Sequence, residues 1–125
     1  MNTQSTNNNH FVITLSECRD DTDRVATPLV LANTALANGG TALLWLTMSG
    51  VELARHGTAQ KLGAVSFAPV SELLDSFIEA GGKIGICPPC GKTHGLTDDD
   101  KLETAEWMGA AAMMAQAQNG QTLSF

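Results

Sequence analysis

Two of the three cysteines of this 125-residue chain lie in one short Cys-Pro-Pro-Cys segment, residues 87–90. An isoleucine-rich run, 83–86, comes directly before Cys87, and Lys92 and His94 follow soon after it. Cationic neighbours can lower the pKa of a cysteine, and the thiolate is the form of cysteine that acts as a nucleophile. The segment therefore predicts a nucleophilic thiol, with Cys87 as the first candidate.

The position of Cys87 supports this prediction. The run 83–86 is typical of a buried strand in a parallel sheet, and ligands of such sheets gather beyond the carboxyl ends of the strands. The two prolines carry no amide hydrogen, so a sulfur anion would need other donors. We expect those donors to be the amides that follow the prolines, with the side chains of Lys92 and His94. We assign the anion-stabilising role to Gly91 and Lys92.

Backbone geometry bears on whether Cys87 and Cys90 act together. A residue that precedes proline is pushed away from the helical region, so Pro88 disfavours a tight turn here. A polyproline-like segment would hold the two cysteines roughly 9 Å apart, beyond the ~7 Å limit for an unstrained disulfide. This geometry favours two thiols that act singly. Three alternatives remain: a dithiol redox pair, a zinc site that also uses Cys18 and His94, and cysteines that only pack.

The rest of the chain predicts the elements that must position these thiols. Further strands are expected at 10–15, 41–47 and 121–125, with a brief one at 64–67. Helices are expected from Thr22 or Thr27 to residues 38–40, at 51–55, at 71–80, and at 105–118 after the acidic cluster 98–100. Strands that alternate with helices predict an α/β fold, a three-layer α/β/α sandwich with a mainly parallel sheet of four to five strands.

Length and charge narrow the function classes. The chain predicts one domain over residues 10–125, preceded by a polar tail, residues 1–9, that we expect to be disordered. The net charge of -6 and only seven Lys and Arg argue against a nucleic-acid partner.

No apolar run is long enough to span a membrane, and the tail lacks the pattern of a signal peptide. Three clustered cysteines suit a reducing compartment, so we expect a cytoplasmic protein. The acidic residues at 17–23 are expected to cap the following helix and to solubilise the surface.

The ordered set of these features resembles the DsrE/DsrF-like family of small sulfur-relay proteins, including its TusD-type and YchN-type members. The resemblance covers nearly everything after residue 9. It rests above all on Cys87-x-x-Cys90-x-x-x-x-Gly95, with the turn 48–51 and the closing residues 122–125. It implies that a cysteine at position 87 carries a persulfide, which receives sulfane sulfur from one protein thiol and hands it to another. Cys90 would then be a resolving or second carrier thiol.

The resemblance also implies partners. Relatives assemble as homo-oligomers, often trimers or hexamers, or as hetero-oligomers. For this chain we expect a homo-oligomer and neither an organic cofactor nor a metal. Many relatives have Arg-Gly where this chain has His94-Gly95, so a permanent charge is replaced by one that changes near neutral pH. If His94 helps to hold a sulfur anion, that help should fade as pH rises. The alternative from another class is a non-catalytic oligomeric binding or regulatory module on the same scaffold.

Overall fold

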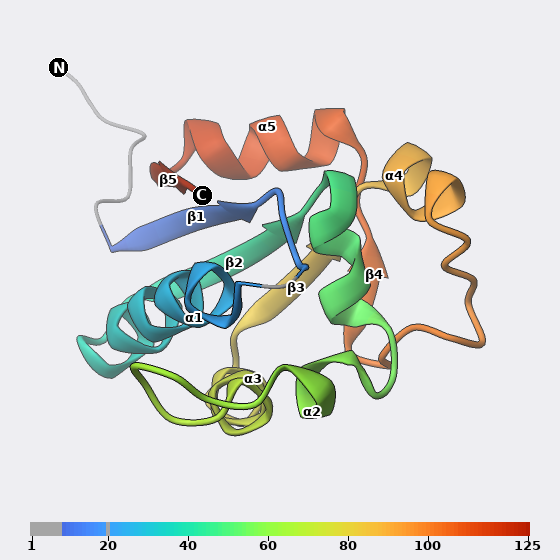
Figure 1. Ribbon diagram of the computed structural model, residues 1–125. Coiled ribbons are helices and arrows are strands. Elements are labelled where there is room, and N and C mark those ends of the chain that lie inside the picture. The colour runs from blue at the N-terminus through green and yellow to red at the C-terminus, as the bar shows by residue number, and fades with distance from the viewer. Residues whose placement is uncertain (1–8, 20) are drawn as a thin grey trace, which may run out of the picture.

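Five parallel strands form a central sheet in the order β4-β3-β2-β1-β5 (Figure 1). The computed structural model describes residues 9–19 and 21–125. The strands are β1 (His10–Leu15), β2 (Thr41–Leu46), β3 (Lys83–Ile86), β4 (Ala105–Trp107) and β5 (Gln121–Ser124). The three central strands are runs of apolar residues, as expected for parallel strands covered on both faces.

Helices cover both faces of this sheet. Helices α1 (Thr22–Ala37) and α3 (Val70–Glu79) pack side by side on one face, and α5 (Ala110–Gln118) lies across the other (Figure 1). The short elements are the 3-10 helix η1 (Met48–Ala54), α2 (Thr58–Leu62) and α4 (Pro88–Thr93). The predicted three-layer α/β/α sandwich is confirmed.

The two faces are unequal in their packing. The main core lies between the sheet and the α1–α3 layer, where the Phe77 ring is fully buried. Gly82 makes room for that ring, because a Cβ atom there would collide with it. On the other face Val12 and Leu43 are buried, yet no residue of α5 is. The fold is thus closed by a deep core on one side and by a thin layer on the other.

Strand register sets which residues meet at the carboxyl edge. Leu15 of β1 lies beside Leu46 of β2, which lies beside Ile86 of β3. The ladder continues past these residues, because the amide of Thr47 donates to the Leu15 carbonyl and that of Cys87 donates to the Leu46 carbonyl. The ends of β2 and β3 therefore bring Thr47 and Cys87 to adjacent positions.

Helix α1 begins at Thr22, the earlier of the two expected starts. Asp21 caps it by accepting a hydrogen bond from the amide of Asp23 at 3.1 Å, and Pro28 lies inside the helix. The expected glycine stop is also present, since Gly39 has a φ of +88° directly after the last turn. The helices at 71–80 and at 51–55 are confirmed with shifted bounds, as α3 and as the longer η1.

The long helix predicted at 105–118 is wrong. Its first residues form β4, which pairs with β3 from Ala105 to Trp107, and the helix begins only after Gly109. The Met108 amide donates to the Ile86 carbonyl at 2.8 Å, which extends the strand pairing into the supposed helix. The acidic cluster 98–100 lies in a turn, and the brief strand expected at 64–67 is irregular. Pairing with a distant strand has overridden local helix propensity.

Two expectations concern the chain ends and membranes. Of the tail 1–9, only Asn9 is among the described residues, and its carbonyl accepts a hydrogen bond from the Thr41 amide at 2.8 Å. Residues 1–8 and Asp20 lie outside the described part. Within the described part, no helix has the length and apolar character needed to cross a bilayer.

Candidate functional site

The Cys-Pro-Pro-Cys segment forms the start of helix α4, and the polyproline geometry expected for it is wrong. Cys87 is the N-cap, and the two prolines occupy the first helical positions. Proline suits these positions because its fixed φ is helical and its missing amide would have no partner there. The extended ψ of Cys87, 116°, satisfies the restriction ahead of Pro88. The Gly91 amide closes the first turn by donating to the Cys87 carbonyl at 2.9 Å.

This turn brings the two thiols together. Residues three positions apart on a helix are neighbours, with Cβ atoms about 5–6 Å apart, instead of the larger separation expected from the sequence. The two thiols lie close enough to act on each other's pKa, the Cys87 thiol as donor toward the Cys90 sulfur. Both residues are partly accessible to solvent, and neither is in a disulfide. The structure therefore holds a thiol pair at the carboxyl end of β3.

The surroundings of the pair distinguish its two members. Burial raises the pKa of Cys87, and so does its hydrogen bond to Cys90. Burial also acts to raise the pKa of Cys90, but hydrogen bonds from the Thr47 hydroxyl, the Cys87 thiol and the Met48 amide outweigh it and lower that pKa. The expectation that Cys87 is the low-pKa thiol is thus wrong. Cys90 loses its proton first, and Cys87 donates to it.

Thr47 and Met48, which follow β2, were not identified as site residues from the sequence. The Thr47 Oγ1 lies 3.4 Å from the Cys90 Sγ. Met48 has a φ of +52° and is the only residue other than glycine with a positive φ in the described ranges 9–19 and 21–125. A signal was available, because both residues follow the strand next to β3 and must therefore reach the same edge of the sheet.

Cys90 opens into a pocket of about 310 Å³, whose lining is Met48, Pro89, Cys90, Thr93 and His94. The side chain of Met48 is 63% exposed, so the mouth of this pocket faces solvent. The pocket gives a second thiol or a small sulfur compound room to approach the Cys90 sulfur. Of the residues predicted for the site, Cys90 and His94 line this pocket, and Cys87 lies beside Cys90 outside its lining.

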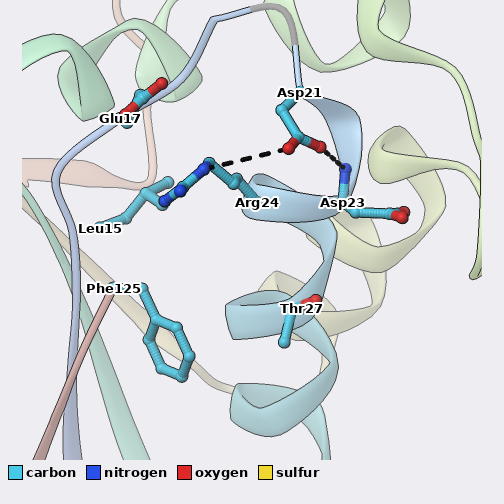
Figure 2. Close-up of a pocket in the computed structure, with 7 residues that line it drawn as sticks. All are labelled: Leu15, Glu17, Asp21, Asp23, Arg24, Thr27 and Phe125. Carbon is cyan, nitrogen blue, oxygen red and sulfur yellow. Dashed lines mark hydrogen bonds and ion pairs between the residues drawn. The ribbon is translucent and has the colours of Figure 1, made fainter.

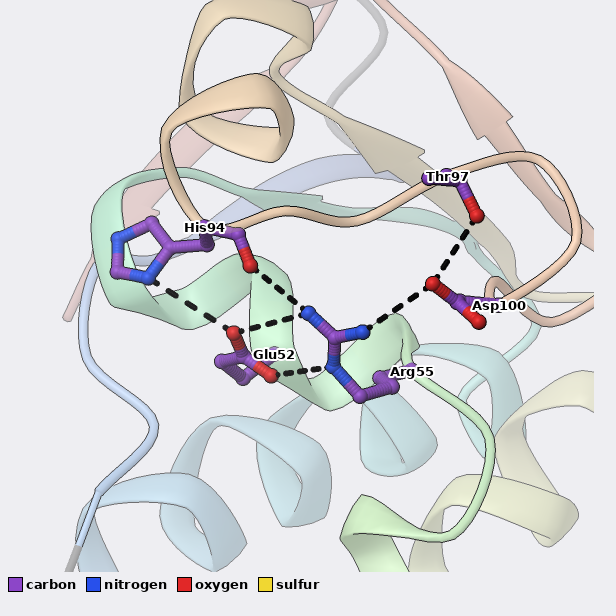
Figure 3. Close-up of polar contacts among 5 residues, drawn as sticks. All are labelled: Glu52, Arg55, His94, Thr97 and Asp100. Carbon is purple, nitrogen blue, oxygen red and sulfur yellow. Dashed lines mark hydrogen bonds and ion pairs between the residues drawn. The ribbon is translucent and has the colours of Figure 1, made fainter.

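His94 is held by an ionic network beneath α4 (Figure 3). Its Nδ1 lies 3.8 Å from a Glu52 carboxylate oxygen, and its carbonyl accepts a hydrogen bond from Arg55 Nη2 at 2.9 Å. Arg55 also donates to both oxygens of Glu52, at 2.7 and 3.3 Å, and to Asp100 at 3.4 Å. Thr97 completes the network by donating to Asp100 at 3.0 Å. The network fixes the C-terminal end of α4 to η1 and turns the imidazole toward Glu52.

Gly91 and Lys92, the predicted anion-stabilising residues, are placed differently. The Gly91 amide is used within the helix, and a Cβ atom at this buried glycine would come within 2.5 Å of Trp107 Cζ3. Lys92 lines a separate pocket of about 330 Å³ together with Pro88 and Trp107. The structure does not bring Lys92 into the Cys90 pocket. Gly91 allows the Trp107 ring to pack against α4.

The thiol of Cys18 has a different environment from the Cys87–Cys90 pair, although Cys18 follows β1 at the same edge of the sheet. It is buried, and burial raises the pKa of its thiol to about 11, with the charge of Glu52 acting in the same direction. Its amide donates to the Ser49 hydroxyl at 3.2 Å. In the described residues, no group of three or more His, Cys, Asp and Glu side chains is arranged to hold a metal ion.

A further pocket of about 350 Å³ lies between the end of β1 and the start of α1 (Figure 2), and its lining is Leu15, Glu17, Asp21, Asp23, Arg24, Thr27 and Phe125. Two of the acidic residues here, Asp21 and Asp23, have structural partners. Asp21 caps α1 and pairs with Arg24 at 3.9 Å, while Asp23 accepts hydrogen bonds from the amide and hydroxyl of Ser66 at 3.2 and 2.8 Å. The capping predicted for this loop is confirmed.

Comparisons with known proteins give the family of sequences that this chain matches. The sequence profile described as the DsrE/DsrF-like family matches residues 9–125. An uncharacterized protein of Methanopyrus kandleri is 32% identical over 96 residues, which cover 77% of this chain and 76% of the relative. An uncharacterized protein of Methanocaldococcus jannaschii is 29% identical over 96 residues, covering 77% and 81%.

Solved structures show the same fold. The YchN protein from E. coli superposes with a TM-score of 0.77 at 13% identity, covering 93% of this chain and 98% of the other. A protein of unknown function from Methanobacterium thermoautotrophicum superposes with a TM-score of 0.68 at 16% identity, again over 93% and 98%.

Proposed function

This chain belongs to the DsrE/DsrF-like family, and from that premise we propose that it carries sulfane sulfur as a persulfide on the Cys87–Cys90 pair and passes it to a partner thiol. The observation that carries the proposal is the pair itself: two hydrogen-bonded thiols, one with a lowered pKa, at an open pocket. A sulfur carrier needs an accessible thiolate and space for an incoming sulfur, and this pocket offers both.

The proposed order of the thiols differs from the order expected from the sequence. The Cys90 thiolate attacks the outer sulfur of a donor persulfide, the donor's S–S bond breaks, and the donor leaves as a thiolate with the bonding electron pair. The outer sulfur is now bound to Cys90. An acceptor thiolate then attacks that sulfur, and Cys90 leaves as a thiolate. Support for Cys90 as the first nucleophile comes from its lowered pKa, whereas Cys87 is the hydrogen-bond donor and the second thiol.

Mass spectrometry after incubation with glutathione persulfide tests the proposal. The expected result is an adduct of about 32 Da, one sulfur atom, on the wild type and on Cys18→Ser. The adduct should be absent from Cys90→Ser, and Cys87→Ser should retain it in part. An adduct that survives Cys90→Ser and disappears in Cys87→Ser would return the carrier role to Cys87. A wild type that takes up no sulfur from several persulfide donors would instead support a non-catalytic binding or regulatory module.

The hydrogen bond between the two sulfurs favours a second candidate, a dithiol redox protein that cycles between the Cys87–Cys90 dithiol and its disulfide. A cytoplasmic location, which we include in the proposal, would keep the thiols reduced between reactions. Equilibration with defined ratios of reduced and oxidised glutathione, followed by trapping of free thiols, separates the candidates. A disulfide that forms near the cytosolic potential supports the redox protein, and a pair that stays reduced there supports the carrier.

The proposal includes a homo-oligomer, a trimer or a hexamer, that assembles through α5. This helix contains no charged residue and none that is buried, and Met114 on it is 52% exposed. An exposed uncharged surface of this kind is typical of one covered by another copy of the chain. Light scattering coupled to gel filtration should show Met114→Lys shifted to a lower mass. Val65→Lys, at a loop residue that is 73% exposed, should leave the mass unchanged. A wild type that is monomeric at micromolar concentration would refute the assembly.

A further inference from the structure

The turn after β2 is held rigidly in front of Cys90. The Thr47 amide donates to the Leu15 carbonyl at 3.0 Å, and the Thr47 carbonyl accepts from the Gly50 amide at 2.9 Å. A Cβ atom at Gly50 would collide with the Leu15 carbonyl, so the turn is pressed directly against the end of β1. These contacts hold the backbone on both sides of Thr47, which places the Thr47 hydroxyl beside Cys90.

This rigid turn imposes an unfavourable backbone conformation. Met48 has a φ of +52°, in the left-handed region that residues with a Cβ atom seldom adopt. The Met48 amide lies on this turn and acts to lower the pKa of the Cys90 thiol. The Met48 side chain, which is 63% exposed, makes no compensating core contact. Strain that persists without a packing reason is often associated with a functional constraint.

Two donors thus converge on one sulfur atom from a neighbouring strand. The Thr47 hydroxyl lies 3.4 Å from the Cys90 Sγ, and the Met48 amide approaches the same atom. We propose that Thr47 and Met48 form an anion site for the sulfur of Cys90, one that stabilises the negative charge this atom carries before it accepts sulfur and again after it releases sulfur.

The part of this inference that concerns sulfur release rests on the proposed function. When an acceptor thiolate attacks the outer sulfur of the Cys90 persulfide, the S–S bond breaks and its electron pair stays on the Cys90 sulfur. Thiol exchange is faster when the leaving sulfur is a more stable anion. The anion site would therefore speed release by stabilising Cys90 as the leaving group. Thr47 contacts the reacting atom and would act directly on it.

Other charged or titratable groups belong to the elements next to Cys90: Cys87 at the end of β3, Lys92 on α4 with His94 at its C-cap, and Glu52 on η1 with Arg55 at its C-cap. Arg55 pairs with Glu52 through two hydrogen bonds, and Lys92 lines a different pocket. Of these groups, Cys87 is the one that acts on the pKa of Cys90, while the His94 imidazole lies toward Glu52. The Thr47 hydroxyl also acts to lower the pKa of Cys87, so a shift in a variant of Thr47 reports the loss of the hydroxyl from both sulfurs.

The test measures the alkylation of Cys90 by iodoacetamide as a function of pH, with the modified residue located by peptide mass spectrometry. Thr47→Val removes the hydroxyl and keeps the branched shape, and Thr47→Ser keeps the hydroxyl. The midpoint of the Cys90 profile should rise in Thr47→Val, with the rate at pH 7 falling several-fold, up to about tenfold for a full pH unit. The Thr47→Ser profile should stay within about twofold of the wild type, which a purely structural role of Thr47 would not predict.

An unchanged profile in Thr47→Val, or an equal shift in both variants, would overturn the anion site. If Thr47→Val fails to fold, Thr47→Ala removes the hydroxyl without added bulk and must show the same rise in midpoint. Alkylation requires no sulfur donor, so its result is independent of the persulfide assay. If Cys90 alkylation is slower in Thr47→Val and the wild type takes up no sulfur in the persulfide assay, the carrier function is refuted and the anion site is supported.

Discussion

Replacing Arg55 by Met should destabilise the protein and loosen the end of α4. The guanidinium makes two hydrogen bonds of good length, to Glu52 at 2.7 Å and to the His94 carbonyl at 2.9 Å, while its other contacts are 3.3 Å or longer (Figure 3). Hydrogen bonds to charged groups contribute about 1.5–3 kcal/mol each when buried. The side chains of Arg55 and Glu52 are 29% and 27% exposed, so solvent weakens each contribution. We therefore expect a loss of about 2–3 kcal/mol in the free energy of unfolding.

Urea denaturation followed by circular dichroism measures this loss, and thermal melting should show a drop of about 8–10 °C. The matched control is Arg24→Met, because Arg24 pairs with Asp21 at 3.9 Å with both side chains 60% or more exposed. That pair should contribute less than about 0.5 kcal/mol. Equal destabilisation by the two variants, or a loss below about 0.5 kcal/mol in Arg55→Met, would refute the reasoning that partial burial strengthens this network.

Three further predictions follow from burial and backbone geometry. Cys18, whose pKa is raised to about 11, should resist iodoacetamide in the native protein at pH 7–8, and rapid labelling of the native protein would contradict this. Because the thiol of the unfolded chain ionises at lower pH, the free energy of unfolding should fall as pH rises from roughly 9 to 11. Gly82→Ala should cost about 2–3 kcal/mol in denaturation experiments because its Cβ meets the buried Phe77 ring, whereas Gly109→Ala, in open space, should cost little. Met48→Gly should raise the free energy of unfolding by up to about 1 kcal/mol, since glycine removes the strain at φ +52°. A destabilised variant would show that the methionine side chain contributes to packing.

Much of the fold could be predicted from the sequence because buried parallel strands leave a strong local pattern. The apolar runs at 10–15, 41–46 and 83–86 are continuous, and each is bounded by turn residues. The failure at 105–118 has a physical cause. The residues of β4 have no strand signal of their own and become a strand only because β3 offers an unpaired edge. Whether a short edge strand of this kind forms depends on the strand that it pairs with.

The prediction for the Cys-Pro-Pro-Cys segment failed for a related reason. The rule that disfavours a helix before proline is a local preference. Here Pro88 and Pro89 begin a helix whose first turn is closed by the Gly91 amide and whose end is held by Arg55. Contacts from η1, a different part of the chain, thus outweigh the local preference. The two thiols meet as a consequence.

The sequence by itself determined the α/β architecture, the family, and the location of two thiols at the end of an interior strand, because these depend on hydrophobic patterning and on residue order. Only the tertiary structure decided which thiol ionises. Thr47 and Met48 reach Cys90 through the register of β2 against β3, and Cys87 reaches it through a helical turn. The charge on a sulfur atom depends on donors within a few ångströms, and residues more than 40 positions away in the chain supply two of them here.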